Sequence, residues 1–453
     1  MPFQGEIATG ESLLSLQNSR AIKEFNAAVR SMPNAERDEP PLVDVPRNQW
    51  MPHRVIAIDG SNLTEPLRNG FPTADASLLK ISVVSIDLAE FERGIADRKS
   101  IPSPRIFYDM EDAATVDVVL PGANVVRCDV VGDTPRRFFR ESVFEVFAQR
   151  LDTTHETLLE TMRAIEQGRH DVTGIHSPVE CCDGALLSAF GPGENHKSCP
   201  CGNGTVYYTD ALRFSERFSD VSSNAEVHGE VRQVLEVLTL FNILRFFAQE
   251  GRLEYLKDNI FIVDGPLALF GHPAWLTPYV REELERIDTY CWERGGFHLC
   301  VFGYEKSGAF VNHFEQVDFD EEQGPRARIA ESSVLALSAS YINRNIALRP
   351  EDAKPHGADT YFGRKVLYKT RTGDHAVITS AMVNAASRDF TRNDLQCYPR
   401  LGDMLNILDR LSTYLYRDGF MPLIRAHAHA AIPLRRGADI IRGLFDGERR
   451  PHA

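Results

Sequence analysis

Two short apolar segments of the sequence each end in an Asp-Gly pair. Residues 55–58 (VIAI) are followed by Asp59, and residues 260–263 (IFIV) are followed by Asp264. A single Asp-Gly pair would indicate only a turn. Two pairs after fully apolar segments instead favour two buried strands whose ends meet at one edge of a sheet. The carboxylates would repel each other there unless a divalent cation, Mg²⁺ or Mn²⁺, lay between them.

A third carboxylate lies in a long apolar helix. The sequence predicts a helix over residues 223–251, and Glu236 lies in its most apolar part. Burying a carboxylate is costly unless a cation compensates its charge. That cation is either Arg232, one helical turn earlier on the same face, or a metal ion. Glu230 is the competing acid, but it lies nearer the polar start of the helix.

Two histidines occur late in the sequence, in the segment LIRAHAHAAI. Either His427 or His429 is suited to act beside a phosphate as a metal ligand, an acid or a charge-stabilising group. The alternative is that one is a hydrogen-bonded histidine beside the core and the other is exposed. Two strand-end acids, a helix acid and a late histidine are together typical of nucleases with a ribonuclease-H-like core. Such enzymes use one divalent ion to activate water and a second to stabilise the leaving oxygen.

Four cysteines lie close together in the sequence, at Cys181, Cys182, Cys199 and Cys201. In a reducing compartment, clustered cysteines indicate a metal site rather than disulfides. Their Cys-Cys and Cys-x-Cys spacings differ from the Cys-x-x-Cys of ordinary zinc ribbons. The alternatives are a structural zinc site, thiols without metal, or a site completed by another side chain. The two candidates for that side chain are His176 and His196.

The bulk composition is that of a globular protein with an acidic balance. The chain has 453 residues and a formal net charge of −14. It contains neither an apolar run of about 18 residues nor a signal-peptide pattern, so we expect a cytoplasmic protein with no membrane partner. The negative charge excludes a surface coated with nonspecific DNA-binding charge. It permits a local basic groove, and basic residues do cluster at 136–140, 364–371 and 435–436.

The elements expected to position these residues alternate between strands and helices, which predicts an α/β fold. The expected strands are 55–58, 78–88, 260–263, 298–303, 361–369 and 375–383. The expected helices are 10–32, 136–168 with a break at LDTTHETL (151–158), 223–251, 278–292, 331–346 and 401–417. Segment 34–52 is interpreted as a proline-rich connector and segment 314–328 as a solvated acidic loop. The predicted organisation is an N-terminal helical arm and linker at 1–50, a main domain at 51–445 and a cysteine-bearing insertion at 171–204.

The motifs resemble, in their order and spacing, those of the NurA nuclease family in its bacterial form. The resemblance covers roughly residues 50–440 and rests on IAIDGSN, TDALRFSERF leading into EVRQVLE, FIVDGPL, GYEKSGAF, DTYFGRKVLYKT and LIRAHAHAAI. It implies a ribonuclease-H-like, Piwi-like core with a central mixed sheet. It also implies a DNA nuclease that favours Mn²⁺ and has 5′-to-3′ exonuclease and single-strand endonuclease activity.

The same resemblance implies roles for individual residues and for partners. It assigns catalytic roles to Asp59, Glu236, Asp264 and His427. The three acids are expected to hold the metal ions, and His427 is expected to assist. Lys306 is expected to contact a phosphate, and Arg364 and Lys365 are expected to line the DNA groove. The protein is expected to form a homodimer that docks on a hexameric FtsK-like ATPase of the HerA type.

Two other functions remain open at this point. One is a nuclease-derived adaptor that binds the ATPase and cuts nothing, and the three retained acids argue against it. The other is a metal-dependent phosphatase that acts on small molecules. The long chain, the separated basic clusters and the N-terminal arm favour a polymer substrate instead. The cellular process would be DNA end processing in repair, or defence against phage.

Overall fold

The computed structural model divides the chain into two units, Met1–Glu39 and Pro40–Ala453. The residues it describes are 19–29, 41–67, 74–90, 111–151, 154–179, 182, 190–320, 322–350, 352–413 and 419–431. In the first unit, helix α2 (Arg20–Ala28) has no buried residue. The helix expected at 10–32 is therefore confirmed over these nine residues, and the rest of that prediction lies outside the described part of the chain.

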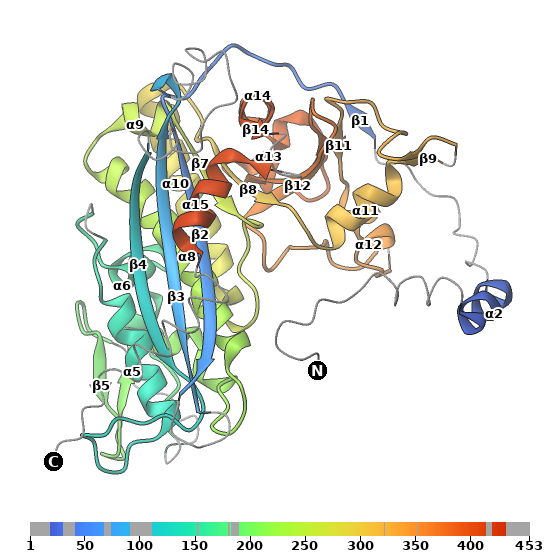
Figure 1. Cartoon of the computed structure of the whole chain (residues 1–453). Coiled ribbons are helices and arrows are strands. Elements are labelled where there is room, and N and C mark those ends of the chain that lie inside the picture. The colour runs from blue at the N-terminus through green and yellow to red at the C-terminus, as the bar shows by residue number, and fades with distance from the viewer. Residues whose placement is uncertain are drawn as a thin grey trace. The chain divides into compact units, whose positions relative to one another are not determined.

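The second unit is built around a nine-stranded mixed sheet with the order β1-β11-β12-β13-β8-β7-β2-β3-β4 (Figure 1). The strands are β1 (Leu42–Val43), β2 (Arg54–Pro66), β3 (Asp75–Asp87), β4 (Glu111–Pro121), β7 (Asn259–Asp264), β8 (Val301–Glu305), β11 (Val334–Ala336), β12 (Gly363–Lys369) and β13 (His375–Ala381). The pairs β2–β7 and β7–β8 are parallel, and the other neighbouring pairs are antiparallel. The fold is thus mixed α/β, as the alternation of elements predicted.

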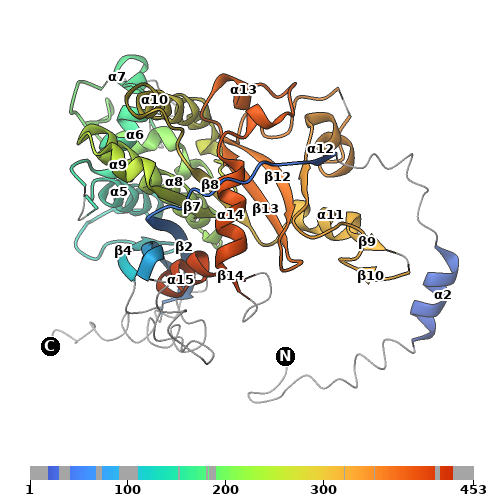
Figure 2. The same ribbon diagram turned by 90° about the horizontal axis from the view of Figure 1, so that it is seen from above.

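Helices cover both faces of this sheet, which explains why its central strands are apolar without alternation. Ile56 and Ile58 of β2 pack into a core with α5 (Pro135–Phe147), α6 (Leu158–Ile165), α8 (Ala225–Gln249) and α10 (Thr277–Gly295). Val55 and Ala57 face the other way, toward α14 (Leu401–Leu411) and α15 (Met421–Ala430). In the view from above, α8 and α10 lie on one side of the sheet and α14 on the other (Figure 2).

Shorter elements complete the second unit. The remaining helices are α7 (Arg169–Thr173), α9 (Leu253–Lys257), α11 (Ala309–Val317), α12 (Ala339–Asn345) and α13 (Ala385–Arg388). Three two-stranded hairpins pair β5 (His196–Ser198) with β6 (Thr205–Tyr207), β9 (Phe319–Asp320) with β10 (Gly324–Pro325), and β14 (Ser412–Thr413) with β15 (Gly419–Phe420). Strand β5 and the hairpin turn lie in the predicted cysteine-bearing insertion at 171–204, and β6 follows directly after it.

Three predicted elements differ from the structure. The helix predicted over 401–417 ends at Leu411, where strand β14 (Ser412–Thr413) follows. The segment 331–346 was predicted to be one helix, but it contains strand β11 followed by α12. Ser338 separates them, because its side chain accepts a hydrogen bond from the Tyr341 amide and begins α12 there. The connector 34–52 likewise contains a short strand, β1, which pairs with β11.

The acidic segment 314–328 is not wholly solvated, as its composition had suggested. Asp318 is fully buried. Its carboxylate lies 2.9 Å from Lys369 Nζ and 2.7 Å from His375 Nε2. These contacts lower the pKa of Asp318, although burial alone would raise it. The buried charge is thus compensated by two strand residues about 50 positions later in the sequence, which local composition does not reveal.

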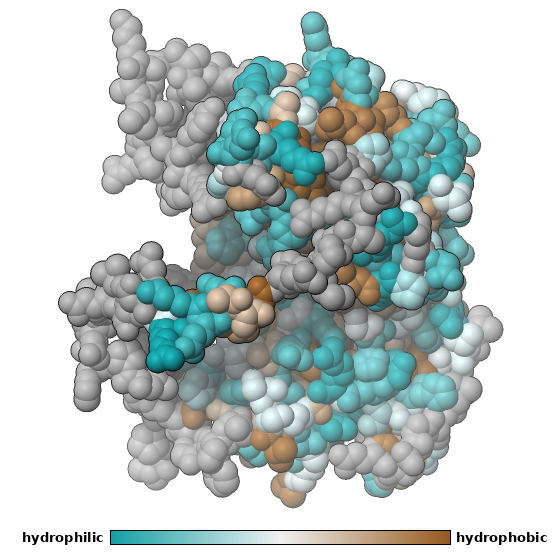
Figure 3. Space-filling model, turned by 90° about the vertical axis from the view of Figure 1, so that its right-hand side faces the viewer, coloured by the Kyte–Doolittle hydropathy of each residue, from teal (hydrophilic) through white to brown (hydrophobic). Residues whose placement is uncertain are grey.

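The surface of the second unit is mixed in character. Figure 3 shows hydrophilic residues spread over much of one face, with apolar residues in separate small groups. Exposed large apolar residues such as Val131, Val221 and Leu348 belong to different segments, and scattered residues of this kind do not by themselves mark an interface. No helix in the described part of the chain has the length and apolar character needed to cross a membrane.

Candidate metal-binding active site

Asp59 and Asp264 lie side by side in the centre of the sheet. Strands β2 and β7 are parallel with Ile58 opposite Val263, so the next residue on each strand is an aspartate. Both aspartates lie on the face of the sheet that α15 covers, because they continue the alternation of Ala57 and Ile262. Asp59 is only 4% exposed. The expectation that two strand acids meet at one place is therefore confirmed by the register.

The first Asp-Gly pair does not end its strand, contrary to our expectation. Strand β2 continues through Asp59 and Gly60 to Pro66, whereas β7 does end at Asp264. Gly60 is needed for close approach rather than for a turn. A Cβ atom there would overlap Glu236 Oε1 and would also press on Arg232. The missing side chain lets α8 bring these two groups against the backbone of β2.

Helix α15 brings His427 to the two aspartates from the far end of the sequence. His427 Nδ1 lies 2.9 Å from Asp59 Oδ2. One ligand atom from each of Asp59, Asp264 and His427 lies within 4.8 Å of the others. Ligands about 2.1 Å from a shared ion lie at most about 4.2 Å apart, so this spacing is close to that of a metal site. We call these three residues the Asp-Asp-His centre. Among the described residues, the group contains His427 and not His429.

The positive charges around the Asp-Asp-His centre only partly compensate the negative charge of the buried Asp59 carboxylate. Burial raises the pKa of Asp59, and the neighbouring charge of Asp264 raises it further. His427 and Lys306 act in the opposite direction. Lys306 follows β8, and its Nζ lies 3.1 Å from Asp264 Oδ2. A cation at this point would favour the charged form of Asp59.

Glu236 approaches from the α8 side of the sheet and is paired with Arg232. Arg232 Nη1 lies 2.5 Å from Glu236 Oε1 and donates a second hydrogen bond, 2.8 Å long, to the Gly60 carbonyl oxygen. Burial raises the pKa of Glu236 to about 8, because Arg232 offsets only part of the burial and the charges of Asp59 and Asp264 add to it. Glu236 therefore lies near both aspartates but outside the Asp-Asp-His centre. The contact with Arg232 is present, and it leaves a role beside a metal ion open.

Glu230, the competing acid, is engaged elsewhere. It forms an ion pair with Arg217, and Gly271 packs against its carboxylate. The charges that affect its pKa come from Arg217, His272 and Glu226, and burial raises that pKa. Glu230 thus belongs to a separate group of charges near the start of α8.

Arg364 and Lys365 do not lie where a DNA groove would need them, because each is only 6% exposed. Arg364 donates hydrogen bonds to the carbonyl oxygens of Asp389 and Arg392. Lys365 Nζ lies 2.6 and 2.7 Å from the two carboxylate oxygens of Glu305. Both positive charges meet oxygen atoms inside the protein, so the expectation that these two residues line a DNA groove is wrong.

Two contacts that position the centre were not predicted from the sequence. Ser61 Oγ donates a hydrogen bond to the Ala430 carbonyl oxygen and so holds the end of α15 against β2. The bond from Arg232 to Gly60 holds α8 against the same strand. The sequence signal for these contacts is the short polar stretch Gly60-Ser61-Asn62 after Asp59, which the Asp-Gly pair led us to interpret as a turn.

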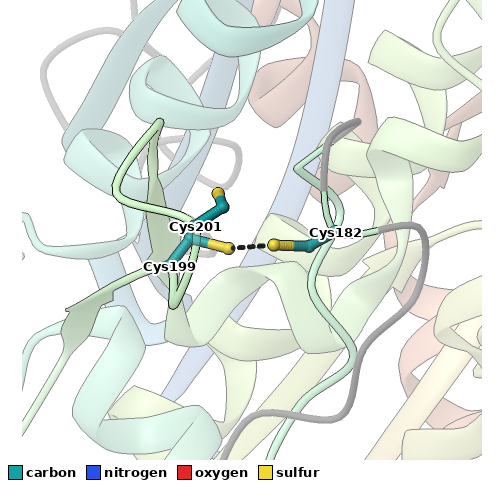
Figure 4. Close-up of side chains that lie close together, drawn as sticks. All are labelled: Cys182, Cys199 and Cys201. Atoms are coloured by element: carbon teal, nitrogen blue, oxygen red, sulfur yellow. Dashed lines mark hydrogen bonds between the residues drawn. The ribbon is translucent and has the colours of Figure 1, made fainter.

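Three cysteines form a second candidate metal site. The Sγ atoms of Cys182, Cys199 and Cys201 lie within 4.8 Å of one another, so these residues could hold a metal ion (Figure 4). We call them the thiol cluster. Cys181, the fourth predicted ligand, lies outside the described residues. Neither His176 nor His196 belongs to the group, although both are described.

Comparisons with known proteins give structural matches only. No protein-family model and no curated protein matches the chain. The NurA nuclease from Sulfolobus solfataricus matches with 11% identity and a TM-score of 0.32, over 98% of both chains. A second NurA structure matches with 11% identity and a TM-score of 0.27, over 98% of this chain and 99% of that one. NurA bound to dAMP and manganese matches with 10% identity and a TM-score of 0.29, over 97% of this chain and 96% of that one.

Proposed function

We propose that the protein is a DNA nuclease that depends on a divalent metal ion. The observation that carries this proposal is the Asp-Asp-His centre. Three residues from distant parts of the sequence each bring a ligand atom to within 4.8 Å of the others. The activities we propose are 5′-to-3′ exonuclease and single-strand endonuclease cleavage, in DNA end processing or defence against phage. These finer assignments follow from the sequence resemblance.

The donor atoms of the Asp-Asp-His centre fit a hard divalent cation. Carboxylate oxygens suit Mg²⁺ and Mn²⁺, and Mn²⁺ also accepts an imidazole. The buried Asp59 carboxyl, whose pKa burial raises, would gain most from a cation beside it. When bound, Mn²⁺ or Mg²⁺ supplies an activated water and stabilises negative charge on the phosphate. The softer sulfur atoms of the thiol cluster suit zinc instead.

The chain's own residues divide the remaining work. His427 uses Nδ1 to contact Asp59, so Nε2 is the ring nitrogen left for the substrate. In its protonated form His427 would donate the Nε2 proton to the leaving oxygen and return to neutral imidazole, and its side chain, 61% exposed, has the access that this needs. In this role the two aspartates hold the ion and Nε2 faces the substrate. Lys306 is placed to contact a phosphate oxygen as a point charge. Glu236, fixed by Arg232, would act from the opposite side as the third acid.

The strand order supports a ribonuclease-H-like core. Three antiparallel strands, β4, β3 and β2, are followed in the sheet by two strands parallel to β2, namely β7 and β8. Helix α8 precedes β7 in the chain, and α10 connects β7 to β8. This arrangement places Asp59 on β2 and Asp264 on the parallel neighbouring strand β7. The two carboxylates can then bind the same metal ion, as the proposed cleavage reaction requires.

The direct test is a cleavage assay with a small-molecule control. The full chain is incubated with linear duplex, circular duplex and single-stranded DNA, each with Mn²⁺, Mg²⁺ or EDTA, and separately with p-nitrophenyl phosphate. We expect cleavage of linear and single-stranded DNA with Mn²⁺, none with EDTA, and no release of nitrophenol. Release of nitrophenol without DNA cleavage would instead establish the phosphatase. Loss of both activities, with binding to the ATPase retained, would establish the adaptor.

His427→Ala is expected to reduce DNA cleavage by about tenfold to a hundredfold, because general acid catalysis of this kind contributes at least that much. His429→Ala is the matched control on the same helix, and we expect it to cleave at the wild-type rate. Initial rates with an end-labelled oligonucleotide in Mn²⁺ measure the difference. Equal loss in both variants would show that the substitutions disturb α15 rather than the chemistry.

We also propose that the protein forms a homodimer and docks on a HerA-type hexameric ATPase. The apolar residues of α2 support an assembly role, because Ile22 and Phe25 are 38% and 65% exposed. An amphipathic helix of this kind is suited to lie in a groove of a partner. Deleting residues 1–33 is expected to leave the second unit folded and to abolish dimerisation or ATPase binding, measured by light scattering. Unchanged assembly would remove α2 from this role.

A further inference from the structure

The thiol cluster joins two separate segments of the chain (Figure 4). Cys182 belongs to one segment, and Cys199 and Cys201 lie at the turn of the β5–β6 hairpin. A tetrahedral site with Zn–S bonds of about 2.3 Å places its sulfur atoms about 3.8 Å apart. The three Sγ atoms lie within 4.8 Å of one another and approach this spacing. We propose that the thiol cluster binds one zinc ion and that this ion clamps the two segments together.

The hairpin turn holds two of the sulfur atoms in defined positions. The Cys199 amide donates to the Gly204 carbonyl oxygen at 2.8 Å, and the Gly202 amide donates to the Cys199 carbonyl oxygen at 2.8 Å. Gly202 has a φ of 74°, a conformation that favours glycine. The Asn203 amide donates to Cys201 Sγ at 3.4 Å. The backbone therefore presents both sulfur atoms before any metal binds.

The third sulfur lies close to the hairpin without forming a disulfide. Cys182 Sγ is 2.9 Å from Cys199 Sγ, whereas a disulfide bond is about 2.05 Å long. A small outward movement of Cys182 would give the separation found around zinc. Structural zinc sites usually have four protein ligands, but in catalytic zinc sites three protein ligands and a water hold the ion, so three thiolates are enough to bind it.

The local fold gives a physical reason for such a clamp. Each strand of the β5–β6 hairpin has only three residues, and a hairpin of that size is marginally stable by itself. Two further contacts link it to the segment that ends at Cys182. Ser177 Oγ lies 3.4 Å from Cys199 Sγ, and Val179 packs against Gly204. The hairpin itself is anchored to the core, because Val206 is fully buried and Arg140 donates a hydrogen bond to the Thr205 carbonyl oxygen. A metal bound by both segments would therefore mainly fasten residues 174–179 to the hairpin.

The clamp would also define the wall of a cavity. A cavity of about 770 Å³ is lined by residues 174–179, which lead toward Cys182, and by Arg213 and Glu216 on another side. None of its lining residues belongs to the Asp-Asp-His centre. Loss of zinc should therefore loosen this wall and the hairpin, and it should leave the proposed catalytic residues in place.

Metal analysis and matched cysteine variants test the proposal. The full chain is purified under reducing conditions without added metal, and its zinc content is measured by elemental analysis. We expect about one zinc ion per chain. Cys199→Ser should lose the ion, whereas Cys128→Ser, which removes an exposed cysteine outside the cluster, should retain it. Replacing zinc with Co²⁺ should give thiolate-to-cobalt absorption in the wild type and in Cys128→Ser only.

A second variant separates metal binding from folding. If Cys199→Ser does not fold, Cys201→Ser tests the same site at a less buried position. It should lower the zinc content and the melting temperature and speed hydrogen exchange in residues 174–179 and 196–207. DNA cleavage per folded molecule should not change. A reduced wild-type protein that contains no zinc, takes up none and shows no Co²⁺–thiolate band would overturn the proposal, as would normal zinc content in both cluster variants.

Discussion

Asp59→Asn is expected to lower the rate of DNA cleavage in Mn²⁺ by at least about a hundredfold. Removing a group that only hydrogen-bonds to a metal ligand already lowers metal affinity or activity by about tenfold to a hundredfold. Removing a direct ligand should lower the activity at least as much. Asn keeps the size of the side chain and can still accept the hydrogen bond from His427 Nδ1. What it loses is the negative charge that would hold the cation. The measurement is the initial rate of cleavage of an end-labelled oligonucleotide.

The same substitution should not weaken the fold. Burial and the charge of Asp264 raise the pKa of Asp59 above its usual 3.8, so the folded state disfavours the charged form. At neutral pH and without metal, the Asp59 charge therefore lowers the free energy of unfolding, and a neutral side chain relieves that cost. We expect the melting temperature of Asp59→Asn in EDTA to equal or exceed that of the wild type. Lost activity together with retained stability would identify a functional residue.

Asp117→Asn is a suitable control for the loss of one negative charge. Asp117 lies on β4, is well exposed and is paired with Lys80, away from the Asp-Asp-His centre. It should cleave DNA at the wild-type rate. Full activity of Asp59→Asn in Mn²⁺ would mean that Asp59 holds no catalytic ion, and the proposed site would have to be abandoned.

The sequence predicted the pairing of the two aspartates better than the detail of their strands. Fully apolar segments identify central strands, because both faces of such strands are covered, and this was sufficient to bring Asp59 and Asp264 together. It was not sufficient to show that β2 continues past Asp59. The reason is that Gly60 is required by Glu236 and Arg232 of α8, and that contact joins residues about 170 positions apart.

The basic residues illustrate why charge in a sequence does not locate a binding surface. Arg364 and Lys365 belong to β12, whose seven residues are all buried, and their charges meet internal oxygen atoms. Lys306, by contrast, follows the end of β8 and reaches Asp264. The resemblance assigned a DNA-contacting role to all three basic residues. Only Lys306 reaches the Asp-Asp-His centre, because it lies just after the end of a strand. The choice of His427 over His429 likewise depends on which of them the end of α15 turns toward Asp59.

Glu236 should make the stability of the metal-free protein depend on pH. Burial raises its pKa from 4.5 to about 8, so between these pH values the folded state holds a proton that the unfolded state has released. The free energy of unfolding must then fall as the pH rises through this window. In EDTA, the difference between wild type and Glu236→Gln should change by up to roughly 4 kcal/mol from pH 4.5 to pH 8. Urea unfolding at several pH values measures it.

The role of Glu236 at the metal can be separated from its ion pair by adding Mn²⁺. If Glu236 contributes to a metal site, saturating Mn²⁺ should favour its charged form and reduce the pH slope of the wild type, and Glu236→Gln should lose most DNA cleavage. Glu230→Gln, on the same helix but paired with Arg217, should cleave normally. If Glu236→Gln also cleaves normally and Mn²⁺ leaves the slope unchanged, then Glu236 serves only to pair with Arg232. In that case Asp59 and Asp264 would hold the catalytic metal without it, with His427 beside them.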